Sequence, residues 1–367
     1  MPPLPAVSLP AALLAAVAAC GACGPPRDAA PDSVSAPAAA PAGELAYVSN
    51  EGSGEVSVID VAADSVVATI AVGTRPRGIR VTPDGRRVFV ALSGSPRCPP
   101  TMPDAECEKL GADKSKDGIA EIDAATRRLV RVLPGGSDPE QFDLTPDGAR
   151  LFVSNEDVGR ASIVDVASGA VARSVDVGRE PEGVRLAPDA RTFYVTSESD
   201  DRVTAVDAAD GTVRGAVRVG KRPRDIAFLA DGRFYVSNEM AGTVSLVEPA
   251  GGAEGAAAPR VAATVTLAAD ASAMGLAVSP DGARLYVATG RGGEVVAVDT
   301  RTNAVVGAVK VGTRPWGIAL TRDGRKLYAA NGPSHDVSVV DVAAMRVVRT
   351  IPVGQLAWGV AVGPAPQ

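Results

Sequence analysis

The sequence contains little histidine, little cysteine and few aromatic residues. Of its 367 residues, one is histidine, four are cysteine and 4% are aromatic. Because His335 is the only histidine, a histidine-rich metal site and a mechanism that needs two histidines are both excluded. The motif C-x-x-C-H does not occur, so covalent haem attachment is not supported. We therefore expect neither a metal nor a cofactor.

Other signatures of well-known function classes are also missing. The sequence has no glycine-rich phosphate loop and no G-x-S-x-G nucleophile elbow. Its net charge of −6 is small and it has no basic cluster, which argues against nucleic-acid binding. The apolar run from Leu9 to Ala19 is too short to cross a bilayer. Catalysis is thus only weakly indicated by motifs.

The sequence does have a repeat. The turn signal Pro-Asp-Gly, or a close relative, recurs at positions 83, 146, 188, 230, 280, 322 and 363, most often at intervals near 42 residues. Between the turns lie short runs that alternate apolar and polar residues and are bounded by Gly, Pro, Asp or Asn, as β-strands are. A fixed period near 40 residues with such runs is typical of an array of four-stranded blades.

This period predicts an all-β fold, a seven-bladed β-propeller with four antiparallel strands per blade, over residues 44–364. The chain enters the repeat on a second strand, 45–50, and leaves it on an inner strand, 358–362. The C-terminal strand should therefore complete the blade begun by the three N-terminal strands, so that the ring has no free edge. Two long intervals indicate insertions at 93–118 and near 251–259.

The N-terminal residues are predicted to be an export signal. Residues 1–20 end in Val-Ala-Ala-Cys, which is similar to a bacterial lipobox in which Cys20 becomes lipidated. An ordinary cleaved signal peptide is the alternative. Residues 21–43 are rich in Pro and Ala and should form a disordered tether. The protein should then lie in the periplasm or on the cell surface, held to the membrane only by the lipid anchor.

The insertion at 93–118 carries the only two cysteines of the repeat region, Cys98 and Cys107. In an oxidising compartment outside the cytoplasm these two residues are expected to form a disulfide that closes a short loop. Two free thiols are the alternative.

Candidate site residues share one position of the repeat. Strand direction places the outer-to-inner and the second-to-third strand connections on one face, around the channel mouth. The position before the inner-strand glycine, which is replaced by Gln141 and Asp225 in two repeats, is occupied by Arg77, Glu140, Glu182, Arg224, Met274, Trp316 and Trp358. Two positions earlier stand Arg75, Asp138, Glu180, Arg222, Ser272, Arg314 and Leu356. The second-to-third strand connections add Glu51, Glu156, Asp157, Glu198, Glu239, His335 and Asp336.

These residue types predict a polar, partly aromatic site for a small anionic or amphipathic ligand, or a docking surface for a partner protein. The alternative is that Arg and Glu of adjacent blades pair with each other and hold the ring together. The asparagines at 50, 155, 238 and 331 also recur at one position and are expected to cap turns.

The segments 151–155 (LFVSN), 234–238 (FYVSN) and 162–166 (SIVDV) resemble the YVTN-type repeat of the YncE-like seven-bladed propellers. The segments 177–189, 238–248 and 331–342 resemble the propellers associated with PQQ-dependent catabolism. That resemblance implies an exported protein encoded near quinoprotein alcohol dehydrogenases. The same superfamily includes lactonases and the haem d1 domain of nitrite reductases, and for the latter His335 is the only available axial ligand.

From these observations we favour a monomeric binding or accessory scaffold of the cell envelope, without enzymatic activity. Its partner would be an envelope protein, such as a quinoprotein dehydrogenase system, or a small anionic ligand. One alternative is a lactonase-like hydrolase that uses carboxylates at the channel mouth. Another is a structural cell-surface protein. An enzyme needs convergent groups in a deep pocket, whereas a scaffold leaves the charges mutually paired.

Overall fold

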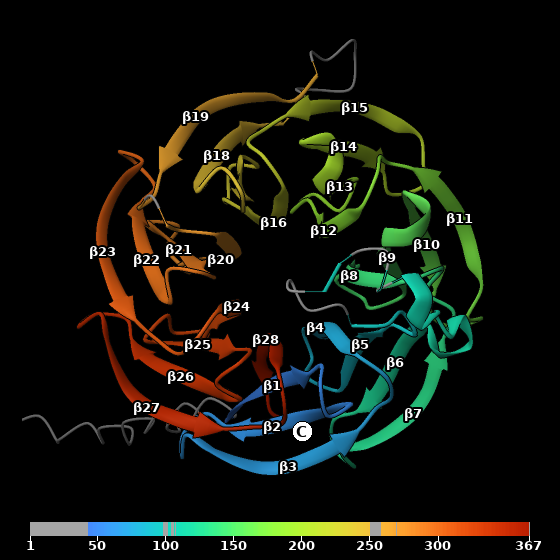
Figure 1. Cartoon of the computed structure of the whole chain (residues 1–367), viewed down its shortest axis with the longest axis horizontal. Helices are drawn as coiled ribbons and strands as arrows, with labels where there is room; N and C mark the ends of the chain where they lie inside the picture. Colours follow the sequence, from blue (N-terminus) through green and yellow to red (C-terminus); the bar gives the residue numbers. More distant parts are fainter. Residues whose placement is uncertain are drawn as a thin grey trace, which may run out of the picture. The chain divides into compact units, whose positions relative to one another are not determined.

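The strands of the protein form seven four-stranded antiparallel sheets that stand as blades around a ring (Figure 1). The computed structural model describes residues 43–97, 102–103, 106, 108–249, 258–268 and 270–366. Within these residues, the labelled helices are four short 3₁₀ turns: η1 (Glu108–Leu110), η2 (Lys114–Lys116), η3 (Glu156–Val158) and η4 (Glu198–Asp200). The predicted all-β, seven-bladed fold with four antiparallel strands per blade is confirmed.

Each blade runs from an innermost strand at the channel to an outermost strand at the rim. The innermost strands are β4 (Pro76–Val81), β8 (Pro139–Leu144), β12 (Pro181–Leu186), β16 (Pro223–Phe228), β20 (Ala273–Val278), β24 (Pro315–Leu320) and β28 (Ala357–Pro364). The second strands are β5 (Arg87–Leu92), β9 (Arg150–Asn155), β13 (Thr192–Ser197), β17 (Phe234–Asn238), β21 (Arg284–Thr289), β25 (Lys326–Asn331) and β1 (Glu44–Asn50).

The third and fourth strands complete the blades in the same order. The third strands are β6 (Gly118–Asp123), β10 (Arg160–Asp165), β14 (Arg202–Asp207), β18 (Thr243–Glu248), β22 (Glu294–Asp299), β26 (Asp336–Asp341) and β2 (Glu55–Asp60). The outermost strands are β7 (Arg128–Leu133), β11 (Val171–Asp176), β15 (Val213–Arg218), β19 (Arg260–Thr266), β23 (Ala304–Lys310), β27 (Arg346–Pro352) and β3 (Ser65–Ala71).

The recurring Pro-Asp-Gly signal forms the turn from an innermost to a second strand. Between β4 and β5, the Thr82 hydroxyl donates to Asp84 Oδ1 at 2.5 Å, and the same oxygen accepts the backbone N–H of Arg86 at 3.0 Å. Gly85 supplies the left-handed backbone, with a φ of 71°. A residue without a Cβ adopts that conformation at little cost, which explains why glycine closes the signal.

The core lies between neighbouring blades. The second strands are buried on both faces because a blade lies against each of them. Phe152 of β9 and Phe193 of β13, for example, stack across two blades with ring centroids 4.6 Å apart. Outermost strands are instead largely exposed, as the pattern of β11 shows. The Val- and Ala-rich composition therefore fits strands packed closely on both sides.

The ring closes as the sequence predicts. β1 pairs antiparallel with β2 on one side and with β28 on the other, and Leu45 lies opposite Gly363. Beyond the strand, the N–H of Ala365 donates to the carbonyl of Gly43 at 2.6 Å. Figure 1 shows β28 from the C-terminus seated between the channel and β1. The two ends of the chain therefore share one blade.

Five of the seven innermost strands have a glycine where the neighbouring strand comes close, and the other two have Gln141 and Asp225 there. A Cβ on Gly183 of β12 would stand 2.2 Å from the carbonyl oxygen of Arg224 on β16, and one on Gly275 would stand 2.4 Å from that of Trp316. This close approach leaves only a narrow channel on the ring axis, with a volume of about 40 Å³. In these five strands the side chain before the glycine is thereby held at a fixed place on the channel wall.

The recurring asparagines serve the blade interior, and the prediction that they cap turns is wrong. The amide nitrogens of Asn50, Asn238 and Asn331 each donate to a serine hydroxyl seven residues later, on the third strand, at 2.9 to 3.0 Å. Asn155 instead accepts from the Ser162 hydroxyl at 2.6 Å. All four are buried. They tie second to third strands at the mouth end of the blade.

Part of what the sequence predicts falls outside the described residues. The signal peptide at 1–20, nearly all of the tether, and Cys20, Cys98 and Cys107 are among the residues not described, so lipidation and the disulfide stay predictions. None of the helices found in the described ranges is long and apolar enough to cross a membrane.

Candidate functional site

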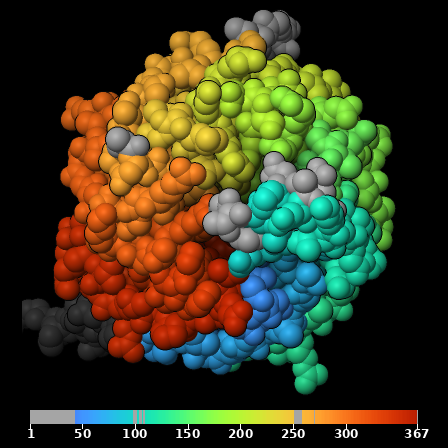
Figure 2. Space-filling model, in the orientation of Figure 1, coloured from blue at the N-terminus to red at the C-terminus, as the bar shows by residue number. Residues whose placement is uncertain are grey.

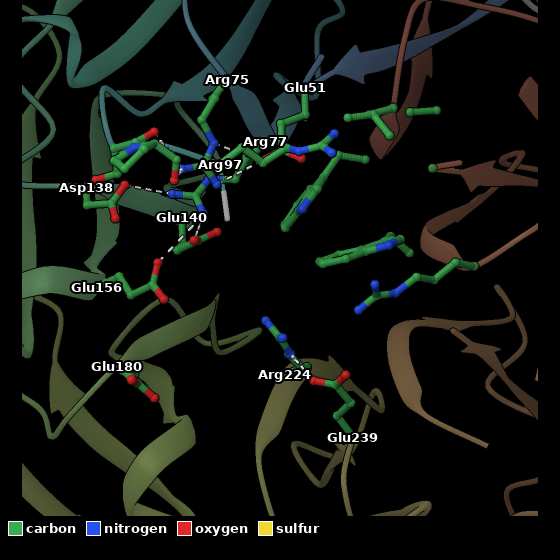
Figure 3. Close-up of a pocket in the computed structure, with 18 of the residues that line it drawn as sticks. Glu51, Arg75, Arg77, Arg97, Asp138, Glu140, Glu156, Glu180, Arg224 and Glu239 are labelled. Atoms are coloured by element: carbon green, nitrogen blue, oxygen red, sulfur yellow. Dashed lines mark hydrogen bonds and ion pairs between the residues drawn. The ribbon is translucent and has the colours of Figure 1, made fainter. Parts of the chain in front are cut away.

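A pocket of about 910 Å³ opens at the channel mouth (Figure 3). It lies on the face that the second-to-third and outer-to-inner strand connections share. Its basic lining residues are Arg75, Arg77, Arg97, Arg222, Arg224, Arg291 and Arg314. Its acidic lining residues are Glu51, Asp138, Glu140, Glu156, Asp157, Glu180 and Glu239. The two sets are equal in number, so the position of each charge decides the character of the pocket.

Five of the seven candidate residues from the repeat line this pocket. They are Arg77, Glu140, Arg224, Trp316 and Trp358. The other two, Glu182 and Met274, line the narrow channel directly beneath. The structure therefore brings all seven to one end of the ring axis, at two depths. Whether these residues bind a ligand stays a prediction.

All seven candidate positions fall in an irregularity of the innermost strand. In β4 the pairing with β5 skips from Pro76 to Ile79, and the same break recurs in the other innermost strands. A bulge of this kind turns a side chain away from the regular alternation of the sheet. The residues at this position can therefore point to the channel and its mouth.

The position two residues earlier is conformationally strained in six of the seven repeats. Positive φ angles between 45° and 58° occur at Arg75, Asp138, Glu180, Arg222, Arg314 and Leu356. A residue other than glycine costs about 1 kcal/mol or more in this region. Glycine would relieve the strain, yet these positions carry long side chains that line the pocket. Such strain is a feature of binding and active sites.

Arg77 is the centre of one buried charge cluster. Its Nη2 lies 2.7 Å from Asp138 Oδ1, and its Nη1 pairs with Glu140 and lies 3.7 Å from Glu156 Oε2. Burial opposes ionisation of Asp138, but Arg77, the Ser93 hydroxyl and Lys114 together hold its pKa below the usual range. Figure 3 shows Arg77 pointing towards these three carboxylates. Asp138 is thus ionised, and it shares the Arg77 guanidinium with Glu140.

Arg224 is the centre of a second cluster. Its Nη1 lies 3.1 Å from Glu182 and 2.5 Å from Glu198, and its Nε lies 2.8 Å from Glu239. Burial raises the pKa of Glu182 to about 8, although Arg224 opposes the shift. Burial also raises the pKa of Glu198, whereas Arg224 and Arg222 overcome burial and lower the pKa of Glu239. Glu182 is therefore largely protonated at neutral pH.

The outer arginines differ in their partners. Arg75 pairs with Glu51 at 2.9 Å, and Arg222 pairs with Glu198 at 2.6 Å and Glu239 at 3.4 Å. Within the described ranges, Arg97, Arg291 and Arg314 have no ion pair. The pocket therefore contains guanidinium groups whose charge is not balanced by a neighbouring carboxylate.

The two tryptophans of the chain lie beside the charge cluster that is centred on Arg224. Their rings are 5.5 Å apart between centroids. The guanidinium of Arg314 lies 5.3 Å from the ring centre of Trp316, and that of Arg224 lies 5.6 Å from it. Both distances are within cation–π range. One side of the pocket thus combines flat apolar surface with positive charge.

The described part of the insertion forms one wall of the pocket. Ser95, Arg97, Gly111 and Ala112 of this β5–β6 connection line it. Asp117 fixes the connection by accepting the backbone N–H of Gly94 at 2.7 Å and that of Asp138 at 2.8 Å. In Figure 2 the teal surface of this part of the chain reaches towards the centre of the ring. The insertion therefore narrows the mouth on one side.

The inner arginines support the interpretation that charges hold the ring together. Arg77 of one blade pairs with Asp138 and Glu140 of the next, and Arg224 pairs with Glu182 of the preceding blade. Three of the outer arginines, Arg97, Arg291 and Arg314, do not follow that pattern, because they have no carboxylate partner in the part of the chain that the structure describes. Among the described residues, the pocket thus contains arginines that pair with carboxylates of adjacent blades as well as arginines without such a pair. The sequence alone left both alternatives open.

His335 lies in the β25–β26 connection and does not line the pocket. It is exposed, and its Nδ1 accepts the N–H of Leu356 at 2.9 Å. Arg97 and Arg291, which do line the pocket, were missing from the sequence-based candidates. Their place in second-to-third strand connections was the available signal. Among the described residues, no group of three or more His, Cys, Asp or Glu side chains is placed to hold a metal ion.

Comparison with known proteins gives a partial family match. Residues 183–348 match the family model "Lactonase, 7-bladed beta-propeller". This stretch spans the blades from β12 to β27 and amounts to less than half of the chain. No curated protein matches the sequence significantly.

Solved structures of similar fold include several propellers. A periplasmic gluconolactonase from Pseudomonas aeruginosa is 22% identical, with a TM-score of 0.70 over 89% of this chain and 100% of that one. A putative 6-phosphogluconolactonase from Bacteroides fragilis is 17% identical, with a TM-score of 0.70 over 89% and 99%. A Kuenenia stuttgartiensis hydrazine synthase chain is 20% identical, with a TM-score of 0.66 over 81% and 92%.

At these identities the structural likeness shows the fold alone. The comparisons do not support the predicted link to quinoprotein oxidation, and they agree better with the lactonase alternative. The narrower YncE-like assignment is not shown by them either. The chain is a seven-bladed β-propeller, and its residues 183–348 resemble the lactonase family of such propellers.

Proposed function

We propose that the pocket is the active site of a lactone hydrolase. The observation that carries this proposal is the pair formed by Glu156 and Arg77 in a pocket large enough for a small ring compound. Glu156 Oε2 lies 3.7 Å from Arg77 Nη1, and its side chain is 32% exposed, so a water molecule can reach it. The match of residues 183–348 to the lactonase family supports the same reaction class.

Glu156 is the proposed general base. It lies at the start of η3, between β9 and β10, and faces the pocket. Its carboxylate would take a proton from water while the water oxygen forms a bond to the lactone carbonyl carbon. The deeper carboxylates Asp138 and Glu140 are nearly fully buried against Arg77, so they hold that arginine in place. Glu156 is the acidic partner of Arg77 with room for a substrate.

Arg224 is the proposed group that stabilises the oxyanion. The ion pairs of Arg224 with Glu182, Glu198 and Glu239 run through Nη1 and Nε, and the residue lines the pocket. Because Glu182 keeps its proton at neutral pH, the positive charge of Arg224 is not overcompensated by three carboxylates. A fixed donor aimed at developing negative charge is an effective form of catalysis in a site that excludes water.

The reaction then closes without a further reagent. The tetrahedral intermediate collapses, the ring carbon–oxygen bond breaks, and the departing ring oxygen receives the proton held by Glu156. The product is a hydroxy acid, which ionises at neutral pH and releases one proton. No side chain is consumed, so Glu156 is ready for the next water molecule.

We place this activity outside the cytoplasm. The export signal predicted at 1–20 supports this location, and so does the name of the Pseudomonas aeruginosa protein, which is a periplasmic gluconolactonase. Anchoring through Cys20 remains part of the proposal.

The test is proton release from a panel of lactones, measured by titration at constant pH. The panel contains sugar lactones, simple aliphatic lactones and aromatic lactones. We expect turnover of at least one class, and we expect Glu156→Gln to lower kcat by about a hundredfold or more while leaving the unfolding midpoint unchanged. Glu248→Gln is the matched control, because Glu248 pairs with an exposed arginine, Arg260, and does not line the pocket.

Two results would contradict the proposal. One is the absence of turnover by the wild-type protein across the panel at pH 6 to 9. The other is a Glu156→Gln variant that is as active as Glu248→Gln. The first result would favour the accessory-scaffold prediction, since the pocket would then bind without reacting.

A further inference from the structure

The charges of the pocket are unevenly distributed around the ring. Asp138, Glu140, Glu156 and Asp157 lie on or directly before the blade of β8 and β9. Across the channel, the blades that begin with β20 and β24 contribute Arg291 and Arg314 and, among the described residues, no acidic lining residue. The pocket therefore has an acidic side and a basic side that face each other.

The basic side also has both tryptophans. Trp316 of β24 and Trp358 of β28 meet there, and Arg314 lies over Trp316. Trp316 is only partly buried, so its ring is open to the pocket. A flat ring bound against this surface would have a guanidinium at its edge. Indole surface and guanidinium together fit a flat aromatic ring that carries a negative charge.

Arg291 and Arg314 have no carboxylate partner among the described residues, although they share one pocket. Burial lowers the pKa of Arg314; Glu239 opposes this, and the neighbouring Arg224, Arg291 and Arg222 add to the lowering. Several positive charges are therefore held near one another at a cost in electrostatic energy. A bound anion would relieve that repulsion, which makes the basic side a site prepared for an anion.

We propose that the basic side, formed by Arg291, Arg314, Trp316 and Trp358, binds the aromatic ring and carboxylate of an aromatic lactone carboxylate. This inference rests on the proposed lactone hydrolase, because it orients the substrate in that active site. With the carboxylate at Arg314, the lactone carbonyl would lie beside Arg224, which is next to Trp316, and would face Glu156 on the opposite side. The basic side thus determines substrate specificity, and the acidic side carries the reaction.

Four lactones test separately whether the site binds an aromatic ring and whether it binds a carboxylate. Phthalide and carboxyphthalide are aromatic, without and with a carboxylate. The aliphatic pair is γ-butyrolactone and its carboxylate derivative. We expect the wild-type protein to have its highest kcat/KM with carboxyphthalide. Arg314→Gln should raise KM for the two carboxylates by roughly tenfold to a hundredfold and leave the neutral lactones nearly unchanged.

Trp316→Leu tests the aromatic surface. This variant should lower kcat/KM for both aromatic lactones by roughly fivefold and have little effect on the aliphatic pair, because ring stacking contributes about 1 kcal/mol beyond area burial. Arg301→Gln is the control for charge, since Arg301 is an exposed arginine in the β22–β23 turn, outside the pocket. It should behave as the wild type with all four lactones.

Binding can be measured without turnover. Because the chain has two tryptophans and both line the pocket, intrinsic tryptophan fluorescence reports on this site alone. Ortho-hydroxymethylbenzoate, the hydrolysis product of phthalide, should quench the fluorescence in a saturable way, and Arg314→Gln should weaken that binding. The neutral analogue, ortho-hydroxymethylbenzyl alcohol, should bind equally to both proteins.

The two proposals can fail separately. Arg314-dependent quenching without turnover of any lactone would support the binding site and reject the hydrolase. Turnover with equal effects of Arg314→Gln on neutral and anionic lactones would reject the binding site and retain the hydrolase. Absence of quenching by ortho-hydroxymethylbenzoate up to millimolar concentration would overturn the inference directly.

Discussion

The carboxyl group of Glu182 lies 3.1 Å from Nη1 of Arg224 on the next blade, yet it holds its proton at neutral pH. Burial is the main cause, and the neighbouring Glu198 adds to it by repulsion. One guanidinium thus faces three carboxyl groups, and not all three ionise together. The arrangement links the stability of the ring to pH.

We expect the free energy of unfolding of the wild-type protein to fall as the pH rises from 4.5 to about 8. The folded pKa of Glu182, about 8, is above its ordinary value of 4.5, so the folded protein holds this proton more tightly than the unfolded chain. The contribution of Glu182 to the free energy of unfolding therefore decreases as the pH rises from the lower of these pKa values to the higher one. Glu182→Gln is neutral at every pH, so its stability relative to wild type should improve by about 1 to 3 kcal/mol from pH 5 to pH 8.

Urea unfolding at pH 5, 6.5 and 8 measures this difference, and Glu239→Gln is the control. The pKa of Glu239 is lowered, so its contribution to stability is fully present above its ordinary pKa of 4.5 and is lost only as the pH falls further. Its variant should be destabilised by a constant amount from pH 5 to 8. A constant difference for Glu182→Gln over the same range would contradict the assignment.

Removal of Arg77 should destabilise the ring strongly. Arg77→Met removes the ion-pair partner that the buried Asp138 and Glu140 share, and breaking a buried ion pair costs about 3 to 5 kcal/mol. Arg75→Met breaks the less buried pair with Glu51 and should cost about 1 kcal/mol. Urea unfolding of both variants decides the matter, and equal losses would show that Arg77 is not a link between blades.

Removal of the last strand should abolish cooperative folding. Deletion of residues 355–367 removes β28 and exposes the edge of β1 as well as the core between the two neighbouring blades. Deletion of residues 366–367 leaves the whole strand in place and is the control. Thermal unfolding followed by circular dichroism should show one sharp transition in the control and none in the longer deletion. A sharp transition in both would mean that the ring closes without β28.

Substitution of a channel glycine should be costly where backbones touch. In Gly183→Ala the new methyl group would meet the carbonyl oxygen of Arg224 at 2.2 Å, so the innermost strands must separate, at a cost of about 3 kcal/mol. Gly307→Ala on β23 meets only the Met345 side chain, at 3.8 Å, and should stabilise by about 0.5 kcal/mol. The midpoints of urea unfolding compare the two variants directly. A tolerated Gly183→Ala would show that the channel is wider than its backbone positions indicate.

Much of the fold could be predicted because it depends on patterns of residues that are close together in the sequence. The turn signal at Thr82 to Gly85 depends on residues only two or three positions apart, and its repetition counts the blades. The phase of the repeat at its two ends also predicts the pairing of β1 with β28. The asparagines show the limit of this reasoning: Asn50 bonds Ser57, which is close in sequence but on another strand, so a turn cap and a strand link cannot be distinguished by type.

The sequence predicted where the candidate residues lie, but it did not predict which of them form ion pairs. The repeat placed Arg77, Glu140, Trp316 and Trp358 at one level of the ring, and the structure places them in one pocket. Arg97 and Arg291 were not found, because their connections differ in length and composition from blade to blade. A sequence repeat identifies only residue types that recur at equivalent positions, whereas Arg97 and Arg291 have no counterpart in the other repeats.

The sequence by itself determined the number of blades, the way the ring closes and the face on which the candidate residues gather, since each of these depends on short-range turns and strand direction. Only the tertiary structure decided that Arg77 and Arg224 are enclosed by carboxylates whereas Arg291 and Arg314, within the described ranges, are not. The physical reason is that ion pairing depends on distances of a few ångströms between residues on different blades. The position of a residue within its own repeat does not contain those distances.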